Sequence, residues 1–161
     1  MQYTVRPAQK PDLERIQEIY AYARAFMAKT GNPNQWGKNH PPAAQLKQDI
    51  ENGSLFVITD GEIIHGVFFF RIGDDPTYHK IDGGAWRSNS PYGTIHRIAG
   101  DGSGGILRTA VEFGRKQIDH LRIDTHEDNL VMQYAVTKLG FQYQGVIVTD
   151  DGSPRIAYDL L

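Results

Sequence analysis

The sequence contains no cysteine. This absence excludes disulfide bonds, metal sites built from thiolates, iron–sulfur clusters and a cysteine nucleophile. An excess of charge of one sign is also missing, because 17 Lys and Arg stand against 19 Asp and Glu, for a formal net charge of −2. Without a general basic field the chain has little means of holding a phosphate backbone, so we expect no nucleic-acid partner.

Long apolar runs are absent as well. The most apolar stretch is Val67 to Phe70, far shorter than the ~20 residues that cross a bilayer as a helix. The opening Met1 to Ala8 (MQYTVRPA) lacks the apolar centre of an export signal. We therefore expect no membrane partner and a cytoplasmic location.

The composition that remains is that of an ordinary globular protein, with 161 residues, 40% hydrophobic and 22% charged. This length is close to that of one typical domain, and no repeat or linker interrupts it. We expect a single domain that spans residues 1–161.

Hydrophobic periodicity and turn residues predict seven strands and four helices. The strands are expected at residues 3–6, 55–58, 63–71, 92–99, 121–124, 141–148 and 156–160. The helices are expected at residues 11–27, 43–52, 106–118 and 130–139. Asp60-Gly61 is typical of a two-residue hairpin turn, and Thr125 with Asp128 fits a capping box before the last helix. The order predicts an α/β (α+β) fold, a mixed sheet with helices on its faces, in which residues 92–124 form a parallel crossover.

Two long loops, residues 30–42 and 73–91, are rich in Gly, Asn and Pro. Loops of this kind often carry binding surfaces. Trp36 lies on the first, and Tyr78 and Trp86 lie on the second, so we consider all three as substrate-binding residues. The alternative is that these rings only fasten their own loops.

Four glycines lie between Gly100 and Gly105, between a strand and a helix. Such a loop lets backbone amides approach an anion at the helix N-terminus, which favours a phosphate or pyrophosphate. Asp101 would repel that anion unless it points away. Gly100, Gly102 and Gly105 also match G-x-G-x-x-G, the fingerprint of dinucleotide-binding folds. That alternative is disfavoured, because only a helix and a hairpin follow Asp124, where such a fold needs further parallel units.

Three segments together resemble one known family. The first is residues 5–16, which begin Val5-Arg6-Pro7-Ala8. The second is the glycine loop, and the third is residues 129–141, which read NLVMQYAVTKLGF. Their order and spacing are similar to the first strand and helix, the pyrophosphate loop and the N-x-x-A-x-x-L-Y-x-K-x-G-F segment of the GCN5-related N-acetyltransferase (GNAT) family. The resemblance covers nearly the whole chain and implies a V-shaped sheet of about seven strands, with acetyl-coenzyme A (acetyl-CoA) in the split.

The resemblance also implies an activity, the transfer of an acetyl group from acetyl-CoA directly to a primary amine of a small-molecule or peptide acceptor. The residues expected to bind the cofactor are Arg97, Ile98, Ala99, Gly100, Gly102, Ser103, Gly104, Gly105, Ile106 and Asn129. No metal is expected, because Asp124, His126, Glu127 and Asp128 lack regular ligand spacing. A homodimer could form through residues 73–91 or the terminal hairpin.

An amine must be neutral to attack a thioester, so a base is expected near the reacting atoms. His96 is the candidate, and we expect it to face the side of the sheet opposite to Arg97, its neighbour on the strand. The tyrosine with which the family commonly protonates the departing thiolate aligns with Val136. Tyr134 would face the wrong side of the helix, so Tyr143 or solvent supplies the proton, or the chain is an inactive acyl-CoA-binding sensor.

Overall fold

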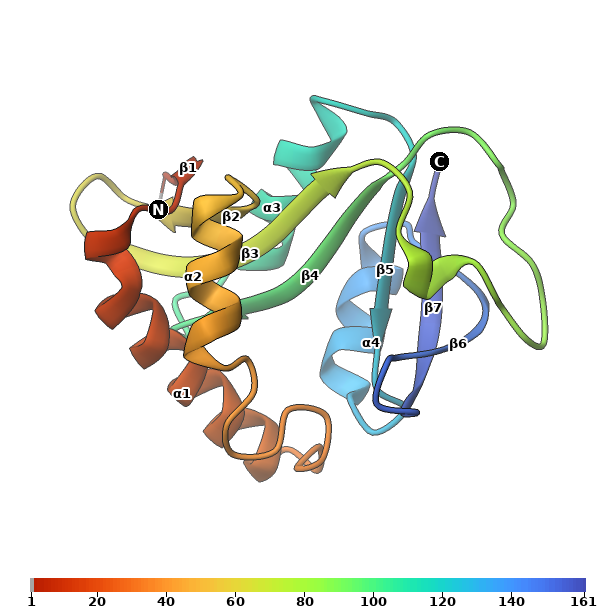
Figure 1. Cartoon of the computed structure of the whole chain (residues 1–161), viewed down its shortest axis with the longest axis horizontal. Helices are drawn as coiled ribbons and strands as arrows, with labels where there is room; N and C mark the ends of the chain where they lie inside the picture. The colour runs from red at the N-terminus through yellow and green to blue at the C-terminus, as the bar shows by residue number, and fades with distance from the viewer. Residues whose placement is uncertain (1) are drawn as a thin grey trace.

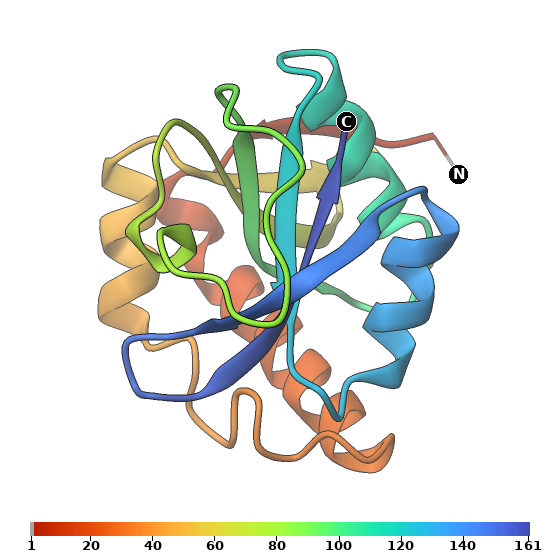
Figure 2. The same cartoon turned by 90° about the vertical axis from the view of Figure 1, so that its right-hand side faces the viewer.

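The computed structural model describes residues 2–161 and contains a mixed sheet of seven strands in the order β1-β2-β3-β4-β5-β7-β6 (Figures 1 and 2). The strands are β1 (Thr4–Pro7), β2 (Leu55–Thr59), β3 (Ile64–Ile72), β4 (Gly93–Gly100), β5 (Leu121–Thr125), β6 (Gln142–Val148) and β7 (Pro154–Leu160). The α-helices are α1 (Leu13–Lys29), α2 (Ala43–Glu51), α3 (Ile106–Arg115) and α4 (Leu130–Lys138), and short 3-10 helices lie at Lys10–Asp12 and Pro76–Tyr78.

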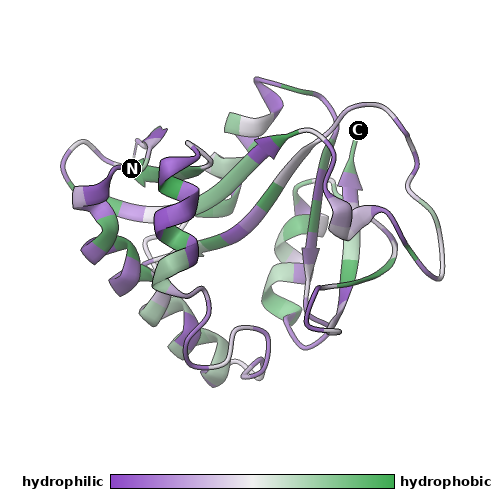
Figure 3. Cartoon of the chain, viewed as in Figure 1, coloured by the Kyte–Doolittle hydropathy of each residue, from purple (hydrophilic) through white to green (hydrophobic). Residues whose placement is uncertain are grey.

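The helices cover both faces of the sheet. Ile16 and Ile19 of α1 and Leu46 of α2 pack on one side of β2 and β3. Ala110 of α3 and Val136 of α4 pack on the opposite side, with residues of β3, β4 and β5. Figure 3 shows hydrophilic and hydrophobic segments alternating along α1 and α2, as expected for helices with one face on a core.

The sheet splits between β4 and β5, the one parallel pair among the strands of residues 2–161. These strands pair only at Gly93 with Leu121 and Thr94 with Arg122. Beyond Thr94 they diverge, which gives the V shape visible in Figure 1. The mixed, V-shaped sheet and the parallel β4-α3-β5 unit are thereby confirmed. A dinucleotide-binding fold is excluded, because it needs several adjacent parallel strands.

Two local predictions were wrong. Asp60-Gly61 is part of a four-residue connection, closed by a hydrogen bond from the Asp60 N–H to the Ile63 carbonyl. The capping box is also absent, because β5 continues through Thr125 and the chain must turn before a helix can begin. Asn129 is the N-cap of α4 instead, and its side chain accepts the Met132 N–H at 3.0 Å.

No helix within residues 2–161 has the length and apolar character needed to span a bilayer.

Candidate functional site

Two adjoining cavities occupy the opening between β4 and β5. One has a volume of about 620 Å³ and is lined by polar side chains from several loops, and we call it the polar cavity. The other, of about 460 Å³, is bordered by the glycine loop, and we call it the glycine-loop cavity. Both are lined by Met27, Ile98, Asn129 and Met132, so they lie next to each other along β4, and we call the two together the groove.

The glycine-loop cavity contains most of the residues expected to bind a cofactor. Ile98, Ala99, Gly100, Gly102, Gly104, Ile106 and Asn129 line it. Arg97 lines the polar cavity instead, and Ser103 and Gly105 line neither. Gly105 is the N-cap of α3, with a left-handed φ of 75° and no side-chain cap. The first amides of α3 therefore have no partner in their own helix and can bind an anion.

Asp101 does not obstruct this anion site. One carboxylate oxygen accepts the Ser103 N–H at 3.0 Å, and the other lies 2.8 Å from His65 Nδ1 and 3.1 Å from an Arg15 nitrogen. Burial acts to raise the pKa of Asp101, but its bonds with Ser103 and His65 outweigh burial and lower it. The negative charge is thus neutralised within the protein, and Asp101 lines neither cavity.

A β-bulge in β4 brings His96 and Arg97 to the same cavity, so the expectation that they face opposite sides was wrong. The register with β3 shifts between Val67 and Phe69, and Arg97 has a φ of 50°. An extra residue at a bulge breaks the two-residue alternation of a strand. The bulge could not be predicted from the sequence, because the residue with the left-handed backbone conformation is an arginine and not a glycine. The strained backbone is held by Tyr20, whose hydroxyl donates to the Arg97 carbonyl at 2.6 Å.

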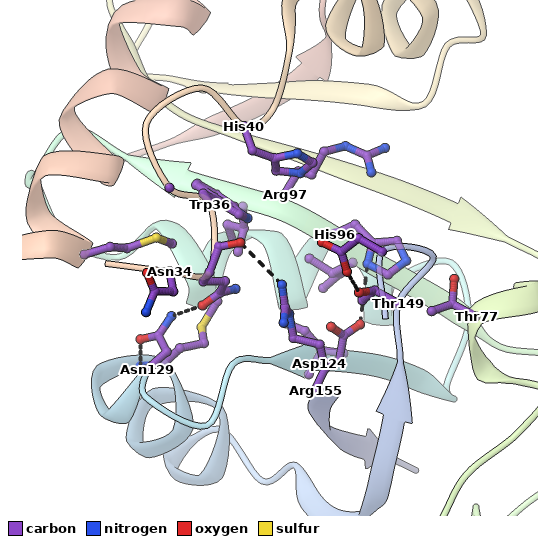
Figure 4. A pocket seen from close by; sticks show the side chains of 18 of the residues that line it. Asn34, Trp36, His40, Thr77, His96, Arg97, Asp124, Asn129, Thr149 and Arg155 are labelled. Carbon is purple, nitrogen blue, oxygen red and sulfur yellow. Dashed lines mark hydrogen bonds and ion pairs between the residues drawn. The ribbon is translucent and has the colours of Figure 1, made fainter. Parts of the chain in front are cut away.

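His96 is held by a carboxylate from the second long loop. Its Nε2 lies 2.8 Å from Asp75 Oδ2, and its Nδ1 lies 3.7 Å from Asp124 Oδ2. Burial would raise the pKa of Asp75, but the bonds from His96 and Thr77 outweigh it and lower the pKa to about 2. Asp75 is therefore ionised at neutral pH and accepts the Nε2 proton. In neutral His96 the lone pair is then on Nδ1, which faces Asp124, as Figure 4 shows.

Asp124 lines the polar cavity, and its carboxylate also bonds to a tyrosine that is buried beside the cavity. Tyr78, which is fully buried, donates its hydroxyl proton to Asp124 Oδ2 at 2.7 Å. Burial, and then the nearby Asp124 carboxylate, raise the pKa of Tyr78 well above its usual value, so this phenol stays protonated. Sequence reasoning missed Asp75 as the partner of His96, because the two meet only when the long loop folds over β4.

The other proposed aromatic residues differ in position. Trp36 lines the polar cavity and packs edge-on against Tyr20, with ring centres 5.6 Å apart. Tyr78 lines neither cavity, but its hydroxyl bonds to Asp124 and its ring packs 5.8 Å from the ring of His96. Trp86 lines neither cavity: its ring packs 4.0 Å from the Arg122 guanidinium, and its N–H donates to the Tyr78 carbonyl. These contacts favour the alternative that Trp86 fastens its own loop, and its role in substrate binding stays a prediction.

The candidate proton donors do not reach the groove. Tyr143 is 54% exposed on β6, packs against Tyr158 and lines neither cavity. Tyr134 is 70% exposed on α4. Val136 is buried in the core between α4 and the sheet. Within residues 2–161, no group of three or more side chains could hold a metal ion.

The sequence matches no protein-family model and no curated protein. Solved structures are similar to it, among them a GNAT-family acetyltransferase from Streptococcus agalactiae with 31% identity and a TM-score of 0.87, over 99% of this chain and 95% of that chain. A second is yncA from Salmonella typhimurium, solved with its cofactor acetyl-CoA, with 15% identity and a TM-score of 0.60 over 98% and 92% of the two chains. A third is the ribosomal-protein-S18-alanine N-acetyltransferase of Escherichia coli, with 13% identity and a TM-score of 0.58 over 99% and 93%. The last two likenesses show the fold alone.

Proposed function

Because the chain belongs to the GNAT family of acetyltransferases, we propose that it transfers an acetyl group from acetyl-CoA directly to a primary amine. The observation that carries this proposal is the pair of adjoining cavities along β4, of which one borders the glycine loop and the other is lined by His96. We further propose that residues 1–161 act as one domain, because the helices of both faces pack on the same sheet.

The glycine-loop cavity suits the cofactor. The amides of the loop and of the first turn of α3 would bind the diphosphate, and the free edge of β4 beyond Thr94 would pair with the amide-rich pantetheine arm. When bound, acetyl-CoA supplies a thioester at the split of the sheet. A backbone N–H of β4 would then hold the carbonyl oxygen and stabilise the oxyanion.

The polar cavity would hold the acceptor amine beside His96. The amine nitrogen forms a bond with the acetyl carbon, and its proton goes to His96 Nδ1 directly or through a water molecule. The carbon–sulfur bond breaks, and coenzyme A leaves as a thiolate. Because Tyr143 lines neither cavity and Val136 is apolar and buried, we assign protonation of the thiolate to solvent. Asp75 is a positioning residue that fixes the tautomer of His96.

The proposal is tested by incubating the protein with acetyl-CoA and a panel of amines and measuring the released thiol. The chain has no cysteine, so coenzyme A is the only source of thiol. We expect release that depends on the amine, and His96→Gln should lower turnover by ~100-fold or more with little change in coenzyme affinity. His79→Gln is the matched control, because His79 also pairs with an aspartate, Asp74, but is exposed outside the groove.

Burial of Val136 in place of the family's tyrosine motivates a second candidate, an acyl-CoA-binding sensor without catalysis. Tight binding of acetyl-CoA with no turnover on any amine would favour this candidate. Absence of binding to coenzyme A would contradict both.

A further inference from the structure

One buried arginine in the polar cavity forms no direct ion pair, although the carboxylate of Asp151, which also lines the cavity, lies near enough for the two charges to interact. Arg155 projects from β7 into this cavity, is only 7% exposed, and forms no ion pair with any carboxylate in residues 2–161. Arg97, the other arginine that lines the cavity, is neutralised by Asp49 at 2.8 Å. Keeping a cation buried without a partner is costly, which suggests that Arg155 has a role that requires its charge.

The hydrogen bonds of Arg155 within residues 2–161 come from Nη1 and Nη2 and not from Nε. Nη1 donates to Ser153 Oγ and to the Pro154 carbonyl, and Nη2 donates to the Gln35 carbonyl at 3.3 Å. No bond from Nε is found in residues 2–161, and Nε is not fully enclosed by protein. Nε and Nη2 share the edge of a guanidinium that can bind a carboxylate with two parallel hydrogen bonds, and Nη2 carries two N–H groups of which one bond to Gln35 uses one.

The nearby acidic residues do not fill this position. Asp151 accepts hydrogen bonds from the Thr149 hydroxyl and the Ser153 N–H, which hold its carboxylate in the turn before β7. His40 lies at this end of the cavity, and its own burial, and then the charges of Arg97 and Arg155, lower the pKa of its imidazole against an opposing effect of Asp151. An anionic group would therefore be stabilised at this end.

The opposite charge prevails around His96, where Asp75 and Asp124 lie within 4 Å of the imidazole. This end would attract an ammonium group before it loses its proton. Figure 4 shows Arg155 and His96 in the same cavity, on either side of Asp124. A volume of about 620 Å³ is that of a small-molecule site.

We propose that the acceptor is a small molecule with both an amine and a carboxylate, and that Arg155 binds the carboxylate while the amine lies at His96. This inference rests on the proposed acetyl transfer and specifies its substrate class. A carboxylate fits better than a phosphate because it is planar, as the guanidinium is. The second negative charge of a phosphate would also be repelled by Asp124, Asp150 and Asp151, which line the cavity too.

The test compares acceptors that differ only in the carboxylate: alanine with alaninamide, γ-aminobutyrate with its amide, and lysine with lysinamide. We expect at least one acid to exceed its amide by ~10-fold or more in kcat/KM. An α-amide lowers the pKa of the neighbouring amine and leaves more of it neutral. A preference for an α-amino acid over its amide can therefore not come from the reactivity of the amine.

Arg155→Gln should remove this preference, mainly by raising KM for the acid. Arg71→Gln is the matched control, because Arg71 is exposed on β3 outside both cavities and the change in charge is the same. If Arg155→Gln does not fold, as judged by circular dichroism, Arg155→Lys decides: it keeps the charge but loses the planar edge, and should reduce the preference by ~3-fold or more.

The outcomes separate this inference from the proposed function. If amides are acetylated as well as acids, or if Arg155→Gln keeps the preference, the inference is wrong while acetyl transfer stands. If no amine is acetylated, the proposed function fails, and calorimetry of the same acids with the coenzyme A complex decides the inference. Binding of an acid that is lost in Arg155→Gln supports it, and absence of binding in the wild type overturns it.

Discussion

The Nε2 atom of His96 lies 2.8 Å from Oδ2 of Asp75, although one residue belongs to β4 and the other to the loop that precedes a 3-10 turn. The loop and the strand therefore share a charged hydrogen bond, and its histidine lines the polar cavity. This bond fixes which imidazole nitrogen can accept a proton.

Replacing Asp75 by Asn should lower kcat by ~10-fold or more while the affinity for coenzyme A stays unchanged. The amide can no longer act as the negatively charged acceptor that keeps the proton on Nε2. Steady-state kinetics and calorimetry measure the two quantities. The neighbouring Asp74→Asn is the control, because Asp74 pairs only with the exposed His79. An equal loss of kcat in both variants would contradict a positioning role for Asp75.

Gly104→Ala should weaken coenzyme A binding. Gly104 has a φ of +88° with no atom within 4 Å of an added Cβ, so the substitution strains the backbone by ~1 kcal/mol without a clash. The control is Gly53→Ala, with a φ of +69°, equally open surroundings and a position between α2 and β2. Both variants should lose similar stability in thermal melts. Only Gly104→Ala should lose coenzyme affinity, and equal affinities would argue against the glycine loop as the anion site.

Tyr143→Phe should change turnover by less than ~2-fold, because the phenol is half exposed and lines neither cavity. Restoring the family residue with Val136→Tyr should not raise turnover. It should instead destabilise the protein by ~1–3 kcal/mol, because position 136 is buried in a packed core. Thermal melts and single-turnover rates measure these effects. A tenfold loss in Tyr143→Phe would identify that residue as the proton donor.

The two tryptophans should give opposite results for KM. Trp36→Leu should raise KM for the acceptor, because its ring lines the polar cavity, and should also cost some stability, because the ring packs on Tyr20. Trp86→Leu should lower the melting temperature and leave KM nearly unchanged, because its ring packs on Tyr78 and Arg122. Kinetics of the two variants with one acceptor distinguish these roles, and a raised KM in Trp86→Leu alone would reverse the assignment.

Sequence reasoning reached the fold because the fold depends on local signals. Apolar periodicity and turn residues located the seven strands and four α-helices of residues 2–161 but not the 3-10 helix at Pro76–Tyr78, and the four glycines between Gly100 and Gly105 indicated an anion site at the start of α3. It failed where position depends on tertiary contacts. The bulge at Arg97 is maintained by Tyr20 and Asp49, which lie far away in the sequence. Arg155 and Asp75 could not be recognised for the same reason, because each enters the site from an element with no motif.

His65 should make stability depend on pH. Its Nε2 lies 2.8 Å from Asp60 and its Nδ1 2.8 Å from Asp101, so the imidazolium bridges the start of β3 and the glycine loop. The bond with Asp60, and then that with Asp101, outweigh burial and raise the pKa of His65. A raised pKa in the folded state means that the stabilisation is complete below the unfolded value of ~6.5 and is lost as the pH rises through the folded value.

His65→Gln should therefore be less stable than the wild type at pH 6, and the difference should shrink at pH 9, where the wild-type imidazole is neutral. Thermal melts at the two values measure this effect. The matched control is His79→Gln, because His79 pairs with Asp74 on the surface, where an ion pair contributes little. Coenzyme A affinity should fall with the same pH dependence in the wild type, since Asp101 anchors the loop amides through Ser103. A stability difference that is constant between pH 6 and pH 9 would show that His65 acts by packing and not by its charge.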